Sequence, residues 1–155
     1  MTKTNAMRRL DAAKIKYEVK EYEVDENDLS GTHIAEQIGL PFAQVFKTLV
    51  AKGEKSGVVV FCIPCDKEID LKKAAIITGN KKLEMLHVKD LLSTTGYIRG
   101  GCSPIGMKKK FPTYIDESAQ SFERITVSAG VRGAQLLLYV AELVEFTQAK
   151  ICQIT

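Results

Sequence analysis

A single lysine stands among apolar residues in a stretch that is typical of a buried β-strand. Residues 45–51 read Val-Phe-Lys-Thr-Leu-Val-Ala. Alternate residues of a strand point to opposite faces, so Lys47 shares its face with Val45 and Leu49. An unpaired ammonium group is costly to bury. Lys47 is therefore expected to meet an anion or to line a cavity, unless the strand lies at a sheet edge and the side chain reaches water.

A glycine-rich loop is the second candidate for ligand binding. Residues 96–106 read Gly-Tyr-Ile-Arg-Gly-Gly-Cys-Ser-Pro-Ile-Gly, and three lysines follow at 108–110. Glycine allows close backbone approach, and free N–H groups can hydrogen-bond an ester carbonyl or a phosphate. The loop matches neither a P-loop nor a dinucleotide fingerprint. A plain turn would have a similar composition. Residues 128–133, Ser-Ala-Gly-Val-Arg-Gly, are a weaker candidate of the same kind.

The cysteines and histidines do not indicate a metal or redox centre. Cys62 and Cys65 have C-x-x-C spacing, but a redox pair places its first cysteine at a helix N-terminus, and Cys62 lies in an apolar strand. No second pair or histidine cluster completes a zinc site. Cys102 lies in the glycine loop and is an alternative nucleophile, although neither histidine is near it in the sequence. We expect no metal and no cofactor.

The net charge of +3 is unevenly distributed along the chain. Residues 1–66 carry a net −1, residues 67–110 a net +6 and residues 111–155 a net −2. A basic segment of this kind can attract the phosphates of a polyanion. A solvated lysine surface that serves solubility is the alternative.

Length and composition place the chain in an ordinary class. A chain of 155 residues, 45% hydrophobic and 26% charged, is predicted to form one domain over residues 1–155. We expect no transmembrane segment and no signal peptide, and therefore a cytoplasmic protein without membrane contact.

Hydrophobic periodicity predicts interleaved helices and strands. Helices are expected over 4–15, from an N-cap at Thr32 to Gly39, from an N-cap at Asp70 to Gly79, and over 88–92 and 141–149. Strands are expected over 17–24, 45–51, 58–63, 112–115, 125–127, 136–140 and 151–154. The runs 45–51 and 58–63 are predicted to form a hairpin of central strands. This pattern favours an α+β fold with a mixed β-sheet surrounded by helices.

Several of these motifs together resemble the YbaK/EbsC family of aminoacyl-tRNA deacylases, most closely its Cys-tRNA(Pro) deacylase branch. The motifs are Phe-Lys-Thr-Leu at 46–49, the glycine loop at 96–106, Lys-Lys at 108–109 with Pro-Thr at 112–113, and the segment 127–133. The resemblance covers almost the whole chain. It implies the editing-domain fold of that family, a mixed sheet with helices around it.

The resemblance also implies a function and a set of site residues. It implies hydrolysis of the ester between a mischarged cysteine and the 3′ adenosine of tRNA(Pro), with prolyl-tRNA synthetase as a candidate partner. It assigns catalytic roles to Lys47, Thr48, Gly100 and Gly101. The substrate-binding positions that it implies are Tyr22, Ser30, Ser128, Arg132, Lys108 and Lys109. Ser30 and Gln135 stand where some relatives carry a bulky aromatic and an acidic residue.

Members of the family that the chain resembles lack a conventional nucleophile, and this chain likewise offers no obvious Ser–His or Cys–His pair. The resemblance thus implies that the thiol of the cysteinyl substrate is the nucleophile. The class is then a carboxylic ester hydrolase, or a lyase if a thiolactone forms. The alternatives are a deacylase for another amino acid such as alanine, a non-catalytic module that binds tRNA or the synthetase, and a thiol-redox protein built on Cys62 and Cys65.

Overall fold

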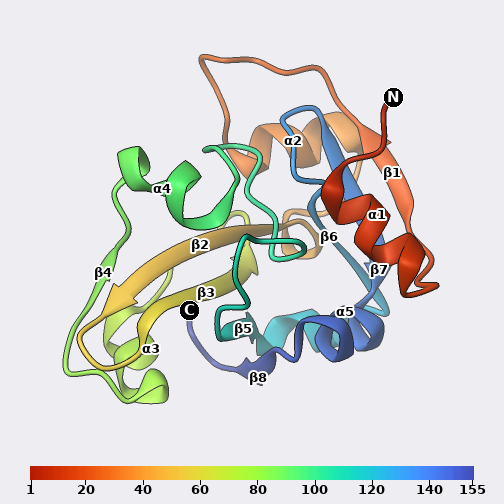
Figure 1. The fold of residues 1–155 in the computed structure, drawn as a ribbon. Helices are drawn as coiled ribbons and strands as arrows, with labels where there is room; N and C mark the ends of the chain where they lie inside the picture. Colours follow the sequence, from red (N-terminus) through yellow and green to blue (C-terminus); the bar gives the residue numbers. More distant parts are fainter.

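The computed structural model describes residues 1–155, which form two β-sheets with helices around them (Figure 1). The first sheet is antiparallel with the strand order β1-β7-β6, and the second is mixed with the order β4-β2-β3-β5-β8. The strands are β1 (Glu18–Glu21), β2 (Phe46–Gly53), β3 (Gly57–Pro64), β4 (Leu83–Met85), β5 (Thr113–Asp116), β6 (Arg124–Ser128), β7 (Ala134–Tyr139) and β8 (Lys150–Cys152). The α-helices are α1 (Asn5–Ala12), α2 (Gly31–Ile38), α3 (Leu71–Thr78), α4 (Val88–Thr95) and α5 (Val140–Thr147).

The two sheets share one large apolar core. A single parallel bridge between Val45 and Thr126 joins them. The largest cluster of buried side chains combines Phe46 of β2 and Ile115 of β5 with Leu136 and Leu138 of β7. The predicted α+β class with a mixed sheet is therefore confirmed, and the sheet is divided into two parts around this core.

Most predicted elements form, because their end signals are local. Asp70 caps α3 by accepting hydrogen bonds from the Lys72 and Lys73 amides, and Gly79 ends that helix in the left-handed conformation at φ 76°. The prediction of Thr32 as the cap of α2 is wrong. Ser30 caps this helix, and its Oγ accepts from the His33 amide at 3.3 Å.

Strand bounds differ from the prediction where tertiary pairing decides them. The first strand ends at Glu21, before Tyr22 and Val24, because β1 pairs with β7 only over Glu18–Glu21. The last strand covers Lys150–Cys152 and not 151–154. The short strand β4 was not predicted; it pairs with the far end of β2 over Ala51–Gly53.

The pairing of β2 leaves half of one edge free, and this matters for the site. The predicted hairpin is confirmed, since β2 and β3 pair in register from Phe46–Pro64 to Gly53–Gly57. β4 covers only the last three residues of β2 on the opposite edge. The first half of β2, which contains Lys47, is therefore central in strand order but open along one edge.

No helix of the structure is long and apolar enough to span a bilayer.

The Asn80 side chain links the β2–β3 turn to the end of α3 through four hydrogen bonds. Its side-chain amide donates to the hydroxyls of Ser56 and Thr78, both at 2.8 Å, and its carbonyl accepts from the amides of Lys55 and Ser56. The residue is 7% exposed. We expect Asn80→Ala to lower the free energy of unfolding by about 2 kcal/mol, because buried partners lose their hydrogen bonds. Urea unfolding measures this change. An unchanged unfolding midpoint would contradict it, and Asn27→Ala on the surface is the control.

Candidate functional site

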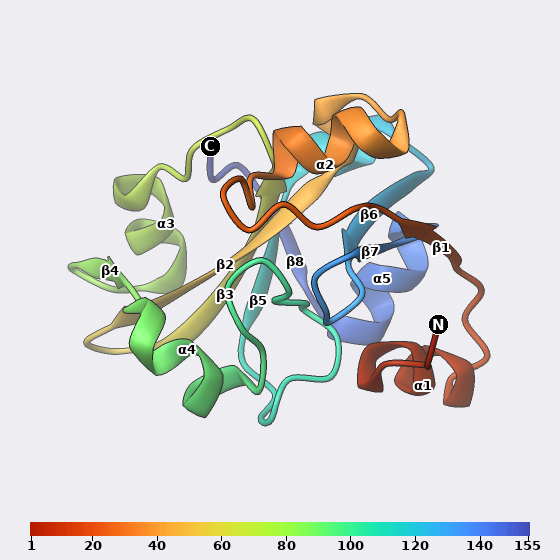
Figure 2. The ribbon, with the colours of Figure 1, turned by 90° about the horizontal axis from the view of Figure 1, so that it is seen from above.

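A pocket of about 330 Å³ opens beside the free edge of β2. Figure 2 shows α2 with the segment before it, the loop after α4 and the β6–β7 turn gathered around the first half of β2. The lining residues come mainly from α2 and the segment before it, the loop after α4, the first half of β2 and the ends of β6 and β7 that flank the turn, and they include Ser30, Lys47, Thr48, Gly100, Ser128 and Gln135. Five of the ten predicted site residues therefore lie in one cavity, although up to 98 positions separate them in the chain.

Lys47 lies on the pocket wall with its charge unpaired. It is half-buried, it forms no ion pair, and it shares its face with Val45 and Leu49 as the alternation predicts. The pocket lining contains one further cation, Arg99, and no carboxylate. A cavity with two free cations and no acidic group is suited to an anionic ligand.

The glycine loop supplies backbone donors to the same cavity. The Gly101 amide already donates to the Ile98 carbonyl at 3.0 Å, whereas the amides of Gly100 and Cys102 have no acceptor within the protein. A Cβ at Gly101 would lie 3.0 Å from the Val131 carbonyl carbon, so any larger residue would push the two loops apart by a few tenths of an ångström. Gly100, with its free amide, and Thr48, whose hydroxyl lies 3.8 Å from the Cys62 Sγ, are thus the candidate donors among the residues of the loop and β2 that line the pocket.

Two polar side chains of the first sheet complete the pocket. The Ser128 Oγ accepts from the Gly130 amide at 3.1 Å and keeps its own proton to donate. Gln135 is 4% exposed, and its side-chain oxygen accepts from the Thr126 hydroxyl at 3.1 Å. This contact fixes the orientation of the Gln135 amide and leaves its NH₂ group without a protein acceptor.

The other predicted site residues lie outside this cavity. Tyr22 donates its amide to the Gly133 carbonyl at 2.9 Å and does not line the pocket. The Arg132 guanidinium lies behind the glycine loop, where its Nε donates to the Arg99 carbonyl at 2.9 Å. Lys108 and Lys109 line a separate hollow. Ser30 does line the pocket, but its hydroxyl is committed to capping α2 and to Asp28, at 2.6 Å.

The cysteine thiols near the pocket are poor nucleophiles. Cys65 and Cys102 line it, and burial raises the pKa of each thiol to about 11. Burial raises the pKa of Cys62 further, to about 12. At neutral pH, a thiol with a pKa of about 11 is ionised in only about one molecule in 10⁴, and the thiolate is the reactive form. All four cysteines are free.

We therefore expect slow alkylation of Cys65 and Cys102 with an unusual pH dependence. A raised pKa lowers the thiolate fraction at every pH below it. The rate in the folded protein should rise about tenfold per pH unit beyond pH 9, whereas unfolded chains level off near 8.5. Iodoacetamide labelling followed by peptide mass spectrometry measures both profiles. A plateau near pH 8.5 in the folded protein would contradict the buried environment.

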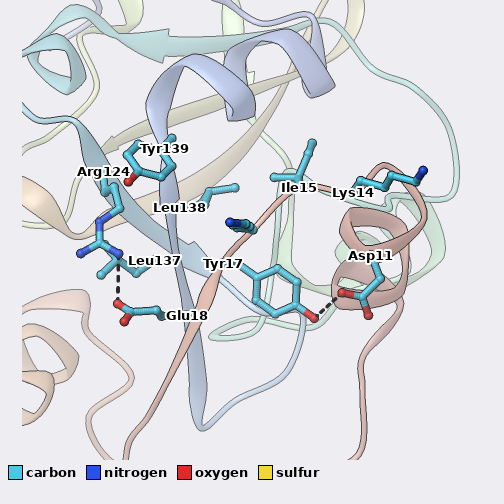
Figure 3. A pocket seen from close by; sticks show the side chains of 10 residues that line it. Asp11, Lys14, Ile15, Tyr17, Glu18, Arg124, Leu137, Leu138 and Tyr139 are labelled. Carbon is cyan, nitrogen blue, oxygen red and sulfur yellow. Dashed lines mark hydrogen bonds and ion pairs between the residues drawn. The ribbon is translucent and has the colours of Figure 1, made fainter.

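A larger hollow of about 700 Å³ lies between the end of α1 and the first sheet (Figure 3). Its two carboxylates already have partners. Asp11 accepts from the Tyr17 hydroxyl at 2.9 Å, and Glu18 pairs with Arg124 at 3.1 Å. None of the predicted site residues lines this hollow, so we assign the candidate site to the smaller pocket.

The sequence reasoning missed several pocket residues. Arg99 stands inside the glycine loop, where its charge next to four glycines was an available signal. Gly31 gave no signal in the sequence; a Cβ there would meet the Cys65 Cβ at 2.4 Å, so glycine is required by tertiary contact. The structure brings together no group of three or more His, Cys, Asp or Glu side chains that could hold a metal ion.

Several known proteins match nearly the full chain in sequence or in structure. EbsC of Enterococcus faecalis (strain ATCC 700802 / V583), whose name proposes a Cys-tRNA(Pro)/Cys-tRNA(Cys) deacylase, is 52% identical over 153 residues, which cover 99% of this chain and 93% of EbsC. A crystal structure described as a proposed trans-editing enzyme for prolyl tRNA synthetase superposes with a TM-score of 0.86 at 24% identity, covering 100% of this chain and 99% of that one. The hypothetical protein APE2540 superposes with a TM-score of 0.88 at 20% identity, covering 97% and 99%.

A proline–tRNA ligase of Thermosipho africanus (strain TCF52B) matches over a shorter region. It is 30% identical over 76 residues, which are 49% of this chain and 13% of the ligase. A family model described as the aminoacyl-tRNA editing domain matches residues 30–146, the segment that carries every residue lining the pocket except Leu29. The resemblance seen in the motifs is thus confirmed, and the chain belongs to the aminoacyl-tRNA editing domain family.

Proposed function

We propose that this protein is a trans-editing deacylase that cleaves the ester between cysteine and the 3′ adenosine of mischarged tRNA(Pro). The observation that carries the proposal is the pocket beside β2, which combines two unpaired cations, Lys47 and Arg99, with free backbone and side-chain donors. The high identity to EbsC supports the choice of cysteine as the amino acid. The domain is proposed to comprise residues 1–155 and to act in the cytoplasm, where translation supplies the substrate.

Each group in the pocket has a chemical task in this proposal. Lys47 and Arg99 would bind the phosphate of the terminal nucleotide and so place the ester beside β2. The Gly100 amide and the Thr48 hydroxyl would donate to the carbonyl oxygen as negative charge develops on it. Ser128 and the Gln135 amide would hold the amino-acid end of the substrate by hydrogen bonds.

The nucleophile is proposed to be the thiol of the substrate itself. The pocket thiols are protonated at neutral pH, whereas an ordinary cysteinyl thiol has a pKa of about 8.5. Its sulfur attacks its own ester carbonyl, the bond to the 3′ oxygen breaks, and that oxygen takes up the thiol proton. Water then opens the cyclic thioester to free cysteine. A thiolactone product would define a lyase, and direct release of cysteine would define a hydrolase.

Deacylation assays with three substrates test the proposal. The protein is incubated with Cys-, Ala- and Pro-tRNA(Pro), and release of the amino acid is followed. We expect rapid loss of cysteine, slow loss of alanine and no loss of proline. Preferential loss of alanine would assign the protein to a different specificity. Binding of tRNA without hydrolysis of any ester would overturn the enzyme proposal in favour of a binding module. Adding prolyl-tRNA synthetase to the assay tests the synthetase as a partner, since a complex of the two proteins would lower the KM for Cys-tRNA(Pro).

A further inference from the structure

A second, strongly basic hollow lies on the continuation of the glycine loop. Its volume is about 290 Å³, and its lining includes Arg9, Lys108, Lys109 and Lys110 but no carboxylate. None of these four side chains forms an ion pair. Four unneutralised cations around one small hollow strongly attract an anion, and phosphates are the anions that such clusters bind in nucleic acids.

The hollow is built by fixed contacts between distant segments. Asn5 and Arg9 lie on the same face of α1, one turn apart. The Asn5 side chain donates to the Gly106 carbonyl at 3.0 Å, which holds this face against the loop that leads to the lysines. The Tyr97 hydroxyl donates to the Ile105 carbonyl at 2.5 Å on the same loop. Arg9 is therefore positioned by tertiary contact opposite residues that follow it by about 100 positions.

The four cationic side chains of the hollow differ in whether they already form hydrogen bonds within the protein. The Lys108 ammonium donates to the Ser93 carbonyl at 3.4 Å, and Lys110 hydrogen-bonds to the Gln148 side chain. Arg9 and Lys109 are exposed, and their side chains form no hydrogen bond within the protein. These two are thus available to a ligand, while Lys108 and Lys110 add fixed positive charge.

Two half-buried aromatic rings, Phe111 and Phe146, also line the hollow. Sites for single-stranded nucleic acid combine basic grooves with aromatic faces on which bases stack. The loop connects the two cavities, because Arg99, Gly100 and Cys102 line the Lys47 pocket, whereas Pro104 and residues 106–110 line the basic hollow. A strand that ends in the Lys47 pocket can therefore continue along the loop to the hollow.

We propose that the Arg9–Lys109 hollow binds an internucleotide phosphate of the single-stranded 3′ end of the tRNA, upstream of the terminal adenosine. This inference rests on the proposed function, because it takes the substrate to be an aminoacylated tRNA. It adds a second contact that recognises RNA backbone and not the amino acid. The hollow makes the protein selective for a polynucleotide over a free nucleoside ester.

The double variant Arg9→Gln/Lys109→Gln tests this contact. We expect its Kd for uncharged tRNA(Pro) and its KM for Cys-tRNA(Pro) to rise about tenfold. The slope of log K against log salt should fall by about 0.7, the value for one phosphate contact of a single strand. The matched control is Lys14→Gln/Lys16→Gln, which removes the same charge from the hollow of Figure 3. This control should change Kd and KM by no more than about twofold and leave the salt slope unchanged, since those lysines make no phosphate contact.

A minimal substrate separates this inference from the proposed function. AMP that carries cysteine on its 3′ oxygen keeps the phosphate of the terminal nucleotide but lacks every phosphate upstream of it, so its hydrolysis depends on the Lys47 pocket and not on the hollow. The Arg9/Lys109 variant should lose much less efficiency on this ester than on the tRNA. Equal losses on both substrates, equal losses in the two double variants, or an unchanged salt slope would each overturn the inference. Failure of the unaltered protein to hydrolyse any ester would instead overturn the proposed function, while tRNA binding and its salt slope still report on the hollow.

Discussion

Replacing Lys47 by alanine is expected to lower kcat/KM for Cys-tRNA(Pro) deacylation by about 10²–10³-fold. The side chain lines the pocket without an ion-pair partner, so its charge is available to the substrate. Losing one well-placed cationic or hydrogen-bonding group from an active site typically has an effect of this size. Single-turnover release of labelled cysteine measures the change. Lys47→Arg should recover only part of the activity, because a planar guanidinium does not reproduce the geometry of an ammonium.

Lys52→Ala is the matched control for Lys47→Ala. Lys52 lies on the same strand, is exposed, and pairs in register with Glu84 of β4 outside the pocket. It should leave deacylation within about twofold of the unaltered protein. Both variants should unfold at nearly the same temperature as the parent, because surface and half-buried cations contribute little to stability. Full activity in Lys47→Ala would disprove the site assignment while leaving the deacylase function open to other residues.

Exchanging the substrate sulfur for oxygen is expected to have an effect at least as large. Ser-tRNA(Pro) should be deacylated about 10³-fold more slowly than Cys-tRNA(Pro). At pH 7.5 about a tenth of the cysteinyl thiol is ionised, and the serine hydroxyl is not. A pocket that selects by size alone separates ligands differing by a methylene by only about 10–200-fold. Competing deacylation of the two tRNAs in one reaction measures the ratio directly.

The pH profile and the protein thiols provide the controls for this second prediction. If the substrate thiol reacts, the rate should level off above about pH 8.5 after the uncatalysed hydrolysis is subtracted. If Cys65 or Cys102 were the nucleophile, the rate would continue to rise toward pH 11, where their thiols ionise. Cys65→Ser and Cys102→Ser should each keep deacylation within about threefold. Loss of activity in either variant, or equal rates on the serine and cysteine esters, would contradict the proposed chemistry.

The predicted elements and the predicted site differ in how far local signals determine them. The predictions that Asp70 caps α3 and that Gly79 ends it are correct, because both signals are local. The Asp70 side chain accepts from amides two and three residues further along the chain, and Gly79 adopts the left-handed conformation. The cap of α2 is wrong, although Thr32 and Ser30 are both reasonable caps by type. Asp28 decides between them, since it accepts from the Ser30 amide and hydroxyl and so holds the chain in its turn before the helix.

The open edge of β2 shows the limit of hydrophobic patterning. Residues 45–51 are apolar enough for a central strand, and β2 does lie between two others. The pattern does not show that β4 reaches only Ala51–Gly53. The free edge that remains makes room for the pocket, so both interpretations of Lys47 hold in part: it lies at a locally unpaired edge, and it lines a cavity.

By itself, the sequence determined the α+β class, the hairpin around residues 52–57, the motifs of the family and the positively charged middle segment. These features depend on residue type and short spacing, which the chain carries before it folds. Tertiary structure alone decided which motifs meet. It brought Lys47, Gly100 and Ser128 into one pocket, set Tyr22 and Arg132 outside it, and joined Arg9 to Lys109 in a second hollow. Such contacts connect segments tens of residues apart, and packing of the whole core around both sheets fixes them.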